Sequence, residues 1–298
     1  MGNSIALAEK FQPILDEIFT RESVTGLLDS RIRVLDHSSA NKIQIFKTSI
    51  VGLGTYDKAE GFPAGDVIGT WEDIQLTQDR GRAFSIDAMD NEETLGMAFG
   101  TLVDEFMRTK VVPEVDAYRF EQFASAVGVS KVAAGATLTS ATILAAIDKA
   151  TAQLDDDQVP MEGRILYIST ACGRMLDAAI TRSLSTERGV DRRLQRLDEM
   201  EIVRVPQSRF YDALDMNDGS VSSTGGYAKA TVSATGKDLN FILMHPSAVW
   251  QAKKHDKLRI FSPDENQTAD AWLFQYRLYH DAGVYDNKVD GIYVHMKA

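Results

Sequence analysis

The chain contains a single cysteine, Cys172, so no disulfide can form within it. No stretch of the sequence approaches the roughly 20 consecutive apolar residues that a membrane-crossing helix needs. The first residues also lack the basic segment and the apolar segment that together mark a secretory signal. We therefore expect a protein that is made and used in a reducing cytosol, without membrane association.

Positive charge is scarce, because 32 Lys and Arg residues face 43 Asp and Glu residues and give a formal net charge of −11. Binding of nucleic acid is driven largely by Lys and Arg, which displace counterions from the phosphates. The sequence has no dense basic run that could do this. A chain this acidic is therefore expected to be a poor ligand for nucleic acid.

Residues that could form a catalytic, cofactor or metal site are also few. Cys172 could be a nucleophile, with one of five histidines as its base, but a lone cysteine is more often a small buried apolar residue. Gly52 and Gly54 lack the third glycine of a dinucleotide-binding loop, and the calcium-loop pattern at 215–219 has Gly226 where its bidentate acid should stand. We predict no catalytic residue, no cofactor and no metal, with an enzyme that uses Cys172 and a distant histidine as an alternative.

A long β-hairpin is predicted near the N-terminus. Apolar residues alternate with polar ones around Ile43 and Ile45, and again around Ile74 and Leu76, as in half-buried strands. Between them lies a flexible segment that contains Pro63 and five glycines: Gly52, Gly54, Gly61, Gly65 and Gly69. A hairpin alone in water is marginally stable. We therefore expect a neighbouring subunit to hold it, which is the first indication of assembly.

The longest helix is expected between residues 90 and 128. A capping box at Asp90 and Glu93 opens it, and apolar residues then recur at three- and four-residue steps. Pro113 should kink this helix or divide it in two.

The remaining elements mix strands and helices. We expect a helix to residue 154 capped by Thr139 or Ser140, strands at 164–168, 201–205, 240–244, 272–279 and 291–295, a helix at 170–184, a short helix with Val249 and Trp250, and turns at 215–226. This mixed order predicts an α+β fold and argues against a doubly wound sheet.

Six motifs, in order along the chain, resemble those of major capsid proteins with the Hong Kong 97-type fold, as found in siphophage-like tailed bacteriophages. They are GLGTYD at 52–57, WE at 71–72, LTQDRGRAFSID at 76–87, VPEVDAYRF at 112–120, VPQSRF at 205–210 and YDNKVDGIYVH at 285–295. The resemblance covers most of the chain, and it is the order and spacing of the motifs that carry it.

The resemblance implies a division of the chain into five parts. These are an N-terminal arm at 1–42, an extended loop at 43–79, a peripheral domain with a long spine helix at 80–135, an axial domain at 136–271, and strands at 272–298 that return to the peripheral domain. Because only about forty residues precede the hairpin, a separate scaffolding protein is expected in place of a long cleaved segment.

The same resemblance implies a structural function and no enzymatic activity. Such subunits assemble through pentamers and hexamers into the icosahedral head of the virion, built in the host cytoplasm. The expected partners are other copies of the chain, a scaffolding protein, a portal, and double-stranded DNA that is enclosed without sequence-specific binding. The alternative within this fold is a shell protein of an encapsulin-like bacterial compartment.

The extended loop is the expected contact between subunits. We predict that Tyr56, Phe62 and Trp71 supply apolar contacts, because exposed aromatic side chains often anchor interfaces. Asp57, Lys58 and Glu60 are expected to form ion pairs across subunits. The simpler interpretation of Trp71 is that its ring packs on its own hairpin.

Overall fold

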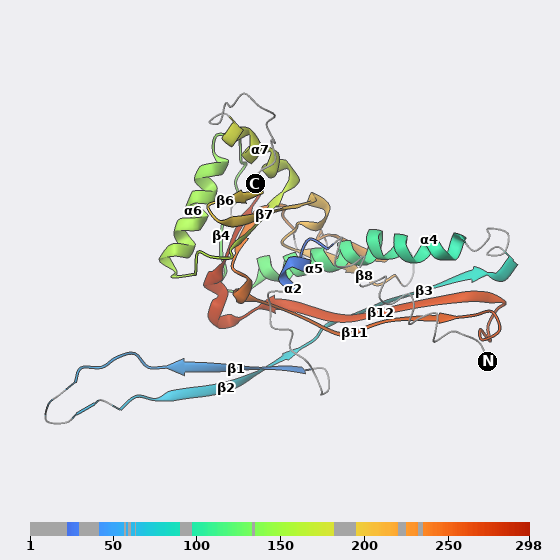
Figure 1. The fold of residues 1–298 in the computed structure, drawn as a ribbon, viewed down its shortest axis with the longest axis horizontal. Helices are drawn as coiled ribbons and strands as arrows, with labels where there is room; N and C mark the ends of the chain where they lie inside the picture. Colours follow the sequence, from blue (N-terminus) through green and yellow to red (C-terminus); the bar gives the residue numbers. More distant parts are fainter. Residues whose placement is uncertain are drawn as a thin grey trace.

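The computed structural model in Figure 1 describes residues 23–29, 42–56, 58, 61–62, 64–89, 97–132, 135–181, 195–219, 225–231 and 235–298. Two larger sheets form the body, and a two-stranded hairpin extends away from them. Helices and strands are both abundant, so the predicted α+β class is confirmed.

A six-stranded sheet has the order β4-β13-β10-β5-β7-β6. Its central strands β5 and β10 are largely apolar and buried throughout, as expected of strands covered on both faces, with Ser169 and Asn240 as buried polar residues. Helices α6 and α7 pack on one face, and the C-terminal half of α5 packs on the other through Phe120 and Phe123. The bounds are β4 Ser130–Val132, β5 Ile165–Ser169, β6 Arg196–Leu197, β7 Met200–Val205, β10 Leu239–Met244, β13 Ile292–Met296, α6 Ile143–Asp156 and α7 Thr170–Thr181.

A three-stranded antiparallel sheet carries the long helix. Strands β11 (Val249–Phe261), β12 (Ala271–Val284) and β3 (Gln78–Asp87) lie in the order β11-β12-β3. Their inner face packs against the helix through an apolar cluster that contains Leu258, Ile260, Phe274, Leu278, Val103, Met107 and Val115. Figure 1 shows the helix running along this sheet.

The long helix changes its winding next to Pro113. Helix α4 (Met97–Phe106) passes into a π-turn, η1 (Met107–Val111), which leads into α5 (Val112–Ser125). Pro113 follows directly after the π-turn, where the Val112 N–H bonds to the Met107 carbonyl five residues earlier. The wider turn lies where a proline ring would otherwise clash with the carbonyl four residues before it. The sequence predicts a kink or a division at this proline, and the structure shows a local change of winding with helical backbone on both sides. The capping box at Asp90 lies outside the described residues.

The predicted hairpin is confirmed. Strands β1 (Lys42–Ile50) and β2 (Val67–Gln75) pair antiparallel, from Lys42 opposite Gln75 to Ile50 opposite Val67. Figure 1 shows the hairpin standing clear of both larger sheets. A second small hairpin and five short helical segments complete the described fold: β8 Leu214–Asn217, β9 Gly226–Lys229, α2 Gly26–Asp29, η2 Gln207–Arg209, η3 Pro246–Ala248 and η4 Asp286–Gly291, with the π-turn given above.

Three local predictions were wrong. Val249 and Trp250 belong to strand β11 and not to a helix, because the chain turns through Pro246–Ala248 and then pairs with β12. Gly283 lies opposite Trp250, and a Cβ at Gly283 would stand 2.7 Å from the indole ring. Thr142 is the N-cap residue of α6, instead of Thr139 or Ser140. The expected turns at 215–226 contain strand residues of β8 and β9.

The strand pairing bears on the predicted boundary at residue 271. Strand β11 lies before this boundary and pairs over nearly its whole length with β12, which lies after it. Strand β13 joins the six-stranded sheet beside β10, whereas β12 joins β3. The five-part division stays a prediction, and we propose a boundary close to residue 248 as one that keeps the three-stranded sheet whole.

Candidate functional site: the exposed hairpin and its anchors

Exposed apolar side chains are concentrated on the hairpin. Of the twelve large apolar side chains that are exposed in the described part of the chain, eight fall between residues 50 and 71. They are Ile50, Val51, Leu53, Tyr56, Phe62, Val67, Ile68 and Trp71. Scattered exposed apolar residues are ordinary, but a concentration of them on one projecting element is typical of a surface that binds another macromolecule.

Two of the six predicted contact residues, Tyr56 and Phe62, contact each other in the structure. The rings of Tyr56 and Phe62 pack on each other near the hairpin tip, with centroids 5.0 Å apart. Trp71 lies on β2 and is 65% exposed, and Lys58 is exposed in the loop. Packing within its own hairpin therefore leaves most of the Trp71 side chain uncovered. Asp57 and Glu60 lie outside the described residues, and contact of any of the six with another subunit stays a prediction.

The base of the hairpin is fixed by apolar packing. Only Leu76 and Thr77 separate β2 from β3, so the hairpin leads almost directly into the three-stranded sheet. Leu76 is 3% exposed and packs with Trp250 and Ala252 of β11. The hydroxyl of Tyr279 also donates a hydrogen bond to the Leu76 carbonyl at 2.8 Å.

A buried carboxylate, Asp281, holds the same connection. Its Oδ2 accepts hydrogen bonds from the Thr77 backbone N–H (2.8 Å) and hydroxyl (3.0 Å). Its Oδ1 accepts from the Tyr118 hydroxyl (2.7 Å) and the Ala282 backbone N–H (2.8 Å). Asp281 is 6% exposed, so these bonds operate in a weakly screened environment. One side chain thus joins the hairpin base, helix α5 and strand β12.

His280 lies beside this group as a neutral ring. It is 2% exposed and packs edge-on against Tyr118, with ring centroids 5.5 Å apart. Burial, together with the charges of Arg119, Lys253 and Arg80, lowers the pKa of His280 from its ordinary value to about 3. Burial also raises the pKa of the Tyr118 hydroxyl, so this group stays a hydrogen-bond donor.

Stability should therefore depend on pH through His280. Below pH 6.5 the unfolded chain binds a proton at this residue that the folded protein does not bind until about pH 3. The free energy of unfolding therefore decreases by about 1.4 kcal/mol for each unit by which the pH falls within this window. Replacing His280 with Leu should remove this contribution. Denaturant titrations at pH 7 and pH 5 check it, and an equal pH dependence in both proteins would contradict it.

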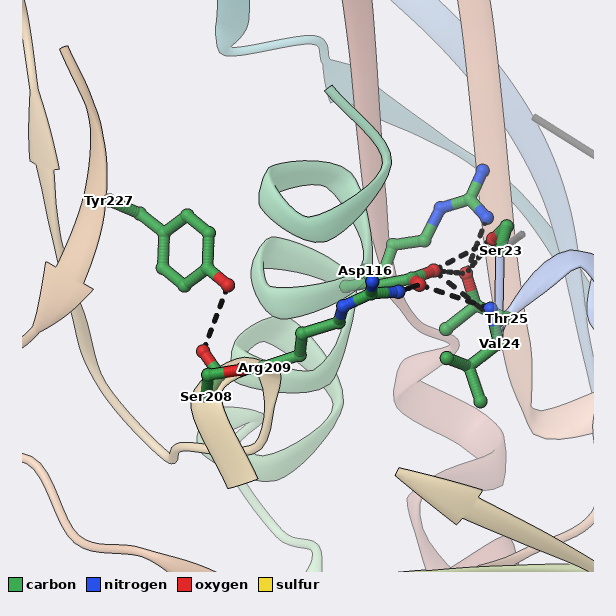
Figure 2. Close-up of polar contacts among 8 residues, drawn as sticks. Ser23, Val24, Thr25, Asp116, Ser208, Arg209 and Tyr227 are labelled. Carbon is green, nitrogen blue, oxygen red and sulfur yellow. Dashed lines mark hydrogen bonds and ion pairs between the residues drawn. The ribbon is translucent and has the colours of Figure 1, made fainter. Parts of the chain in front are cut away.

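A second buried carboxylate, Asp116 of α5, holds the segment at residues 23–29. Figure 2 shows Ser23, Val24 and Thr25 gathered around it. Asp116 accepts hydrogen bonds from the Ser23 hydroxyl (2.7 Å), the Thr25 hydroxyl (2.6 Å) and the Val24 backbone N–H (3.0 Å). Arg209 forms an ion pair with Oδ2 of Asp116 at 3.1 Å, the oxygen that also accepts from the Val24 N–H. Asp116 is fully buried, so removal of one of these partners would leave a buried polar group unpaired and would be costly.

Replacing Asp116 with Asn should release this segment. An amide cannot accept all of these hydrogen bonds, and Arg209 would lose its carboxylate partner. We expect the free energy of unfolding to fall by about 2–4 kcal/mol. We also expect faster proteolysis near residues 23–29. Limited proteolysis followed by mass spectrometry checks the second effect, and unchanged cleavage in that segment would contradict the assignment.

Cys172 is a buried thiol near the start of α7. Its Sγ lies 3.5 Å from Oδ1 of Asn240, and it is 4% exposed. Burial raises the pKa of this thiol. Its hydrogen-bond partner is an amide and not a base, although the Asn240 side chain in turn contacts Nδ1 of His295. This arrangement fits a small packed side chain better than an activated nucleophile.

Two further observations concern metal ions and membrane-spanning helices. Across the described ranges, no group of three or more His, Cys, Asp or Glu residues is placed to hold a metal ion. None of the helices in the described residues is long and apolar enough to span a bilayer.

The two buried carboxylates were not predicted. Asp116 stands in a largely apolar helical run, VDAYRF at 115–120, and an acid at such a position signals a buried partner. Asp281 offers no comparable signal, because its partner Thr77 lies 204 residues away in the sequence. Only the strand pairing brings the two together.

Comparison with solved structures identifies this architecture. The capsid structure of cyanophage P-SCSP1u matches with a TM-score of 0.61 and 16% sequence identity, covering 89% of this chain and 86% of that one. The capsid structure of the Helicobacter pylori bacteriophage KHP30 matches with a TM-score of 0.60 and 14% identity, covering 94% and 90%. The chain has the Hong Kong 97-type capsid fold.

This capsid fold extends beyond phage structures. A virus-like particle from Pyrococcus furiosus matches with a TM-score of 0.55 and 9% identity, covering 96% of this chain and 98% of that one. Comparison by sequence, with family models and with curated proteins, gives no match. The fold resemblance predicted from the motifs is confirmed, and it holds at identities where sequence comparison has little power.

Proposed function

We propose that the chain is a major capsid subunit that assembles with copies of itself into a closed shell. The observation that carries this proposal is the projecting hairpin, which displays eight exposed large apolar side chains on the capsid fold. A hairpin that buries so little apolar area by itself requires a partner surface. Repeated contacts of this kind make a shell stable even when each contact is weak.

The finer assignment is a tailed-bacteriophage head. In this proposal pentamers and hexamers close an icosahedral shell in the host cytoplasm around double-stranded DNA, with the help of a scaffolding protein and a portal. The function is then structural and not enzymatic. The similarity to several phage capsid structures supports it.

The second candidate is a shell protein of an encapsulin-like compartment. The similarity to the Pyrococcus furiosus particle, which spans nearly the whole of both chains, favours it. The two candidates differ in what the shell holds. A phage head would enclose nuclease-protected DNA when it is produced in its natural host, and a compartment would enclose a folded cargo protein.

Light scattering of the purified protein over a range of concentrations tests the shared part of the proposal. We expect a sharp increase of scattering above a threshold concentration, alone or after addition of the scaffolding protein. Nuclease treatment followed by mass spectrometry of the particles then separates the two candidates. A protein that stays monomeric under all of these conditions would refute both.

A further inference from the structure

Strand β3 is an open edge of the three-stranded sheet. It pairs with β12 on one side, and no strand in the described residues pairs with its other side. Its central residues, Gly81 to Ala83, are exposed. Unpaired backbone groups along an edge can accept a further strand, and native proteins usually cover or blunt such edges. Strand β3 therefore offers a place at which another chain can add to the sheet.

The register shows which backbone groups of β3 face outward. The Ala88 N–H donates a hydrogen bond of 3.1 Å to the carbonyl of Asp270, the residue opposite it. Hydrogen-bonded and non-hydrogen-bonded pairs alternate along an antiparallel ladder, so the odd-numbered residues of β3 direct their N–H and C=O groups away from β12. Gly81 fits this pattern, because a Cβ there would stand 3.7 Å from Cα of Arg277, the residue opposite it. Within the described ranges, the outward N–H groups of Gly81 and Ala83 have no hydrogen-bond partner.

A cavity of about 940 Å³ borders this edge. The consecutive residues from Asp79 to Arg82 line it. Successive side chains of a strand point to opposite faces of the sheet, so it is the edge of β3, and not one face alone, that borders the cavity. The π-turn η1 and the hairpin of β8 and β9 form the other walls. The volume lies at the upper end of the range for ligand-binding pockets.

Two arginines of β3 connect the walls of the cavity. Arg80 donates hydrogen bonds to Glu114 of α5 at 2.6 Å and to the Gly226 carbonyl of β9 at 3.2 Å. Arg82 reaches the end of the β8–β9 hairpin, because a Cβ at Gly219 would stand 2.6 Å from its Nη1. The walls are therefore held in place before a ligand binds, which lowers the entropic cost of binding.

The cavity is cationic, although the chain has a net charge of −11. Five Lys and Arg side chains line it, against three Asp and Glu side chains. Two of the cations, Arg82 and Lys110, are exposed and form no ion pair in the part of the chain that the structure describes. The rings of Phe84 and Phe106, with centroids 5.0 Å apart, add an apolar part to the lining. A suitable occupant therefore combines acidic side chains with an apolar one.

We propose that this cavity binds an extended acidic peptide of another protein, which adds to β3 as a fourth strand. The outward backbone groups of Gly81 and Ala83 pair with the peptide backbone, as in other complexes in which a peptide extends a sheet. Side chains opposite Arg80 and Arg82 are then acidic, and the one opposite Phe84 is apolar, at two-residue steps. A second copy of β3 is a poor occupant, because two-fold pairing about Gly81 would place arginine opposite arginine.

A synthetic peptide tests the inference on full-length subunits below the threshold concentration for assembly, so the result does not depend on the proposed function. The acetylated peptide TVTETET, which matches an antiparallel strand on β3, should bind in a fluorescence-anisotropy titration. Arg82→Glu/Lys110→Glu should weaken this binding roughly tenfold or more. The control Lys149→Glu/Arg174→Glu changes the same charges at exposed positions of α6 and α7 and should bind like the wild type. If thermal melting showed that the first variant is unfolded, Arg82→Gln/Lys110→Gln would take its place, with the same expectation.

Hydrogen exchange distinguishes strand addition from a contact between charges. At saturating peptide, the amides of Gly81 and Ala83 should exchange roughly tenfold or more slowly than in the free subunit. The amides of Arg80 and Arg82 face β12 and should change little. A peptide that is N-methylated at its third and fifth residues lacks the donors for β3 and should bind roughly tenfold more weakly.

Several outcomes would overturn the inference. They are no binding of TVTETET, equal binding of the charge-reversed peptide TVTKTKT, and binding without slower exchange at Gly81 and Ala83. If duplex DNA bound in place of the peptide and Arg82→Glu/Lys110→Glu abolished that binding, the cavity would be a nucleic-acid surface. If exchange at Gly81 slowed with rising protein concentration alone, the edge would pair with a second copy. Failure of the wild type to form shells would refute the proposed function and leave this inference standing.

Discussion

Deletion of residues 54–65 should leave a folded subunit that forms no closed shells. The deleted segment includes the tip of the hairpin, where Tyr56 and Phe62 pack on each other away from the body. Its described residues take no part in the apolar clusters of the two larger sheets, so the free energy of unfolding should change by less than about 1 kcal/mol. Circular dichroism and thermal melting check the fold, and electron microscopy checks assembly. Normal shells from this variant would refute the role of the hairpin.

Two double variants distinguish the effect of the exposed apolar side chains on assembly from the effect of shortening the loop. Ile50→Ser/Val67→Ser changes two residues that face each other on the hairpin and are 73% and 68% exposed. Val127→Ser/Met161→Ser changes two comparably exposed residues outside it, at 93% and 62%. The first variant should assemble poorly and the second normally. Equal behaviour of the two would show that exposed apolar area on the hairpin has no special role.

Replacement of Asp281 with Ala should destabilise the subunit and loosen the hairpin at its base. Four donors, among them the Thr77 N–H and the Tyr118 hydroxyl, would lose their buried acceptor. The expected loss is about 3 kcal/mol in the free energy of unfolding, because unsatisfied buried donors are costly. Hydrogen exchange at the Thr77 amide should accelerate more than exchange in β5 or β10. This local effect distinguishes an anchor of the hairpin from a general loss of stability.

Asp79→Asn is the control for this prediction. Asp79 forms an exposed ion pair with Arg277 on the same sheet, and such pairs contribute less than about 1 kcal/mol. The milder variant Thr77→Val keeps the carboxylate and removes a single hydroxyl, so it remains informative if Asp281→Ala fails to fold. If Thr77 exchange is unchanged relative to β5 in either variant, Asp281 does not anchor the hairpin.

The hairpin could be predicted because its signals are local. Alternating apolar residues near Ile43 and Ile74, and the glycines between them, indicate two strands joined by a long flexible segment. The strand that begins at Val249 was missed for the opposite reason. Its conformation is set by pairing with β12 and by the space that Gly283 leaves for Trp250, and neither is visible in a short window of sequence.

The cations on the outer face of the three-stranded sheet and the two buried carboxylates could not be predicted, because their surroundings depend on strand register. Lys257 and Arg277 are twenty residues apart in the sequence and become neighbours only through the pairing of β11 with β12. Asp116 could be recognised as an acid in an apolar helical run, whereas Asp281 offers no such signal, and the partners of both lie far away along the chain. Composition alone, with its net charge of −11, conceals a cationic surface on one sheet.

An electron-microscopic reconstruction of particles assembled from the purified protein tests the central claim most directly. The account predicts a closed shell in which the hairpin of each subunit, residues 42–75, lies on the body of a neighbouring subunit. A particle in which the hairpin contacts only its own subunit, or a protein that remains monomeric with and without a scaffolding protein, would contradict it.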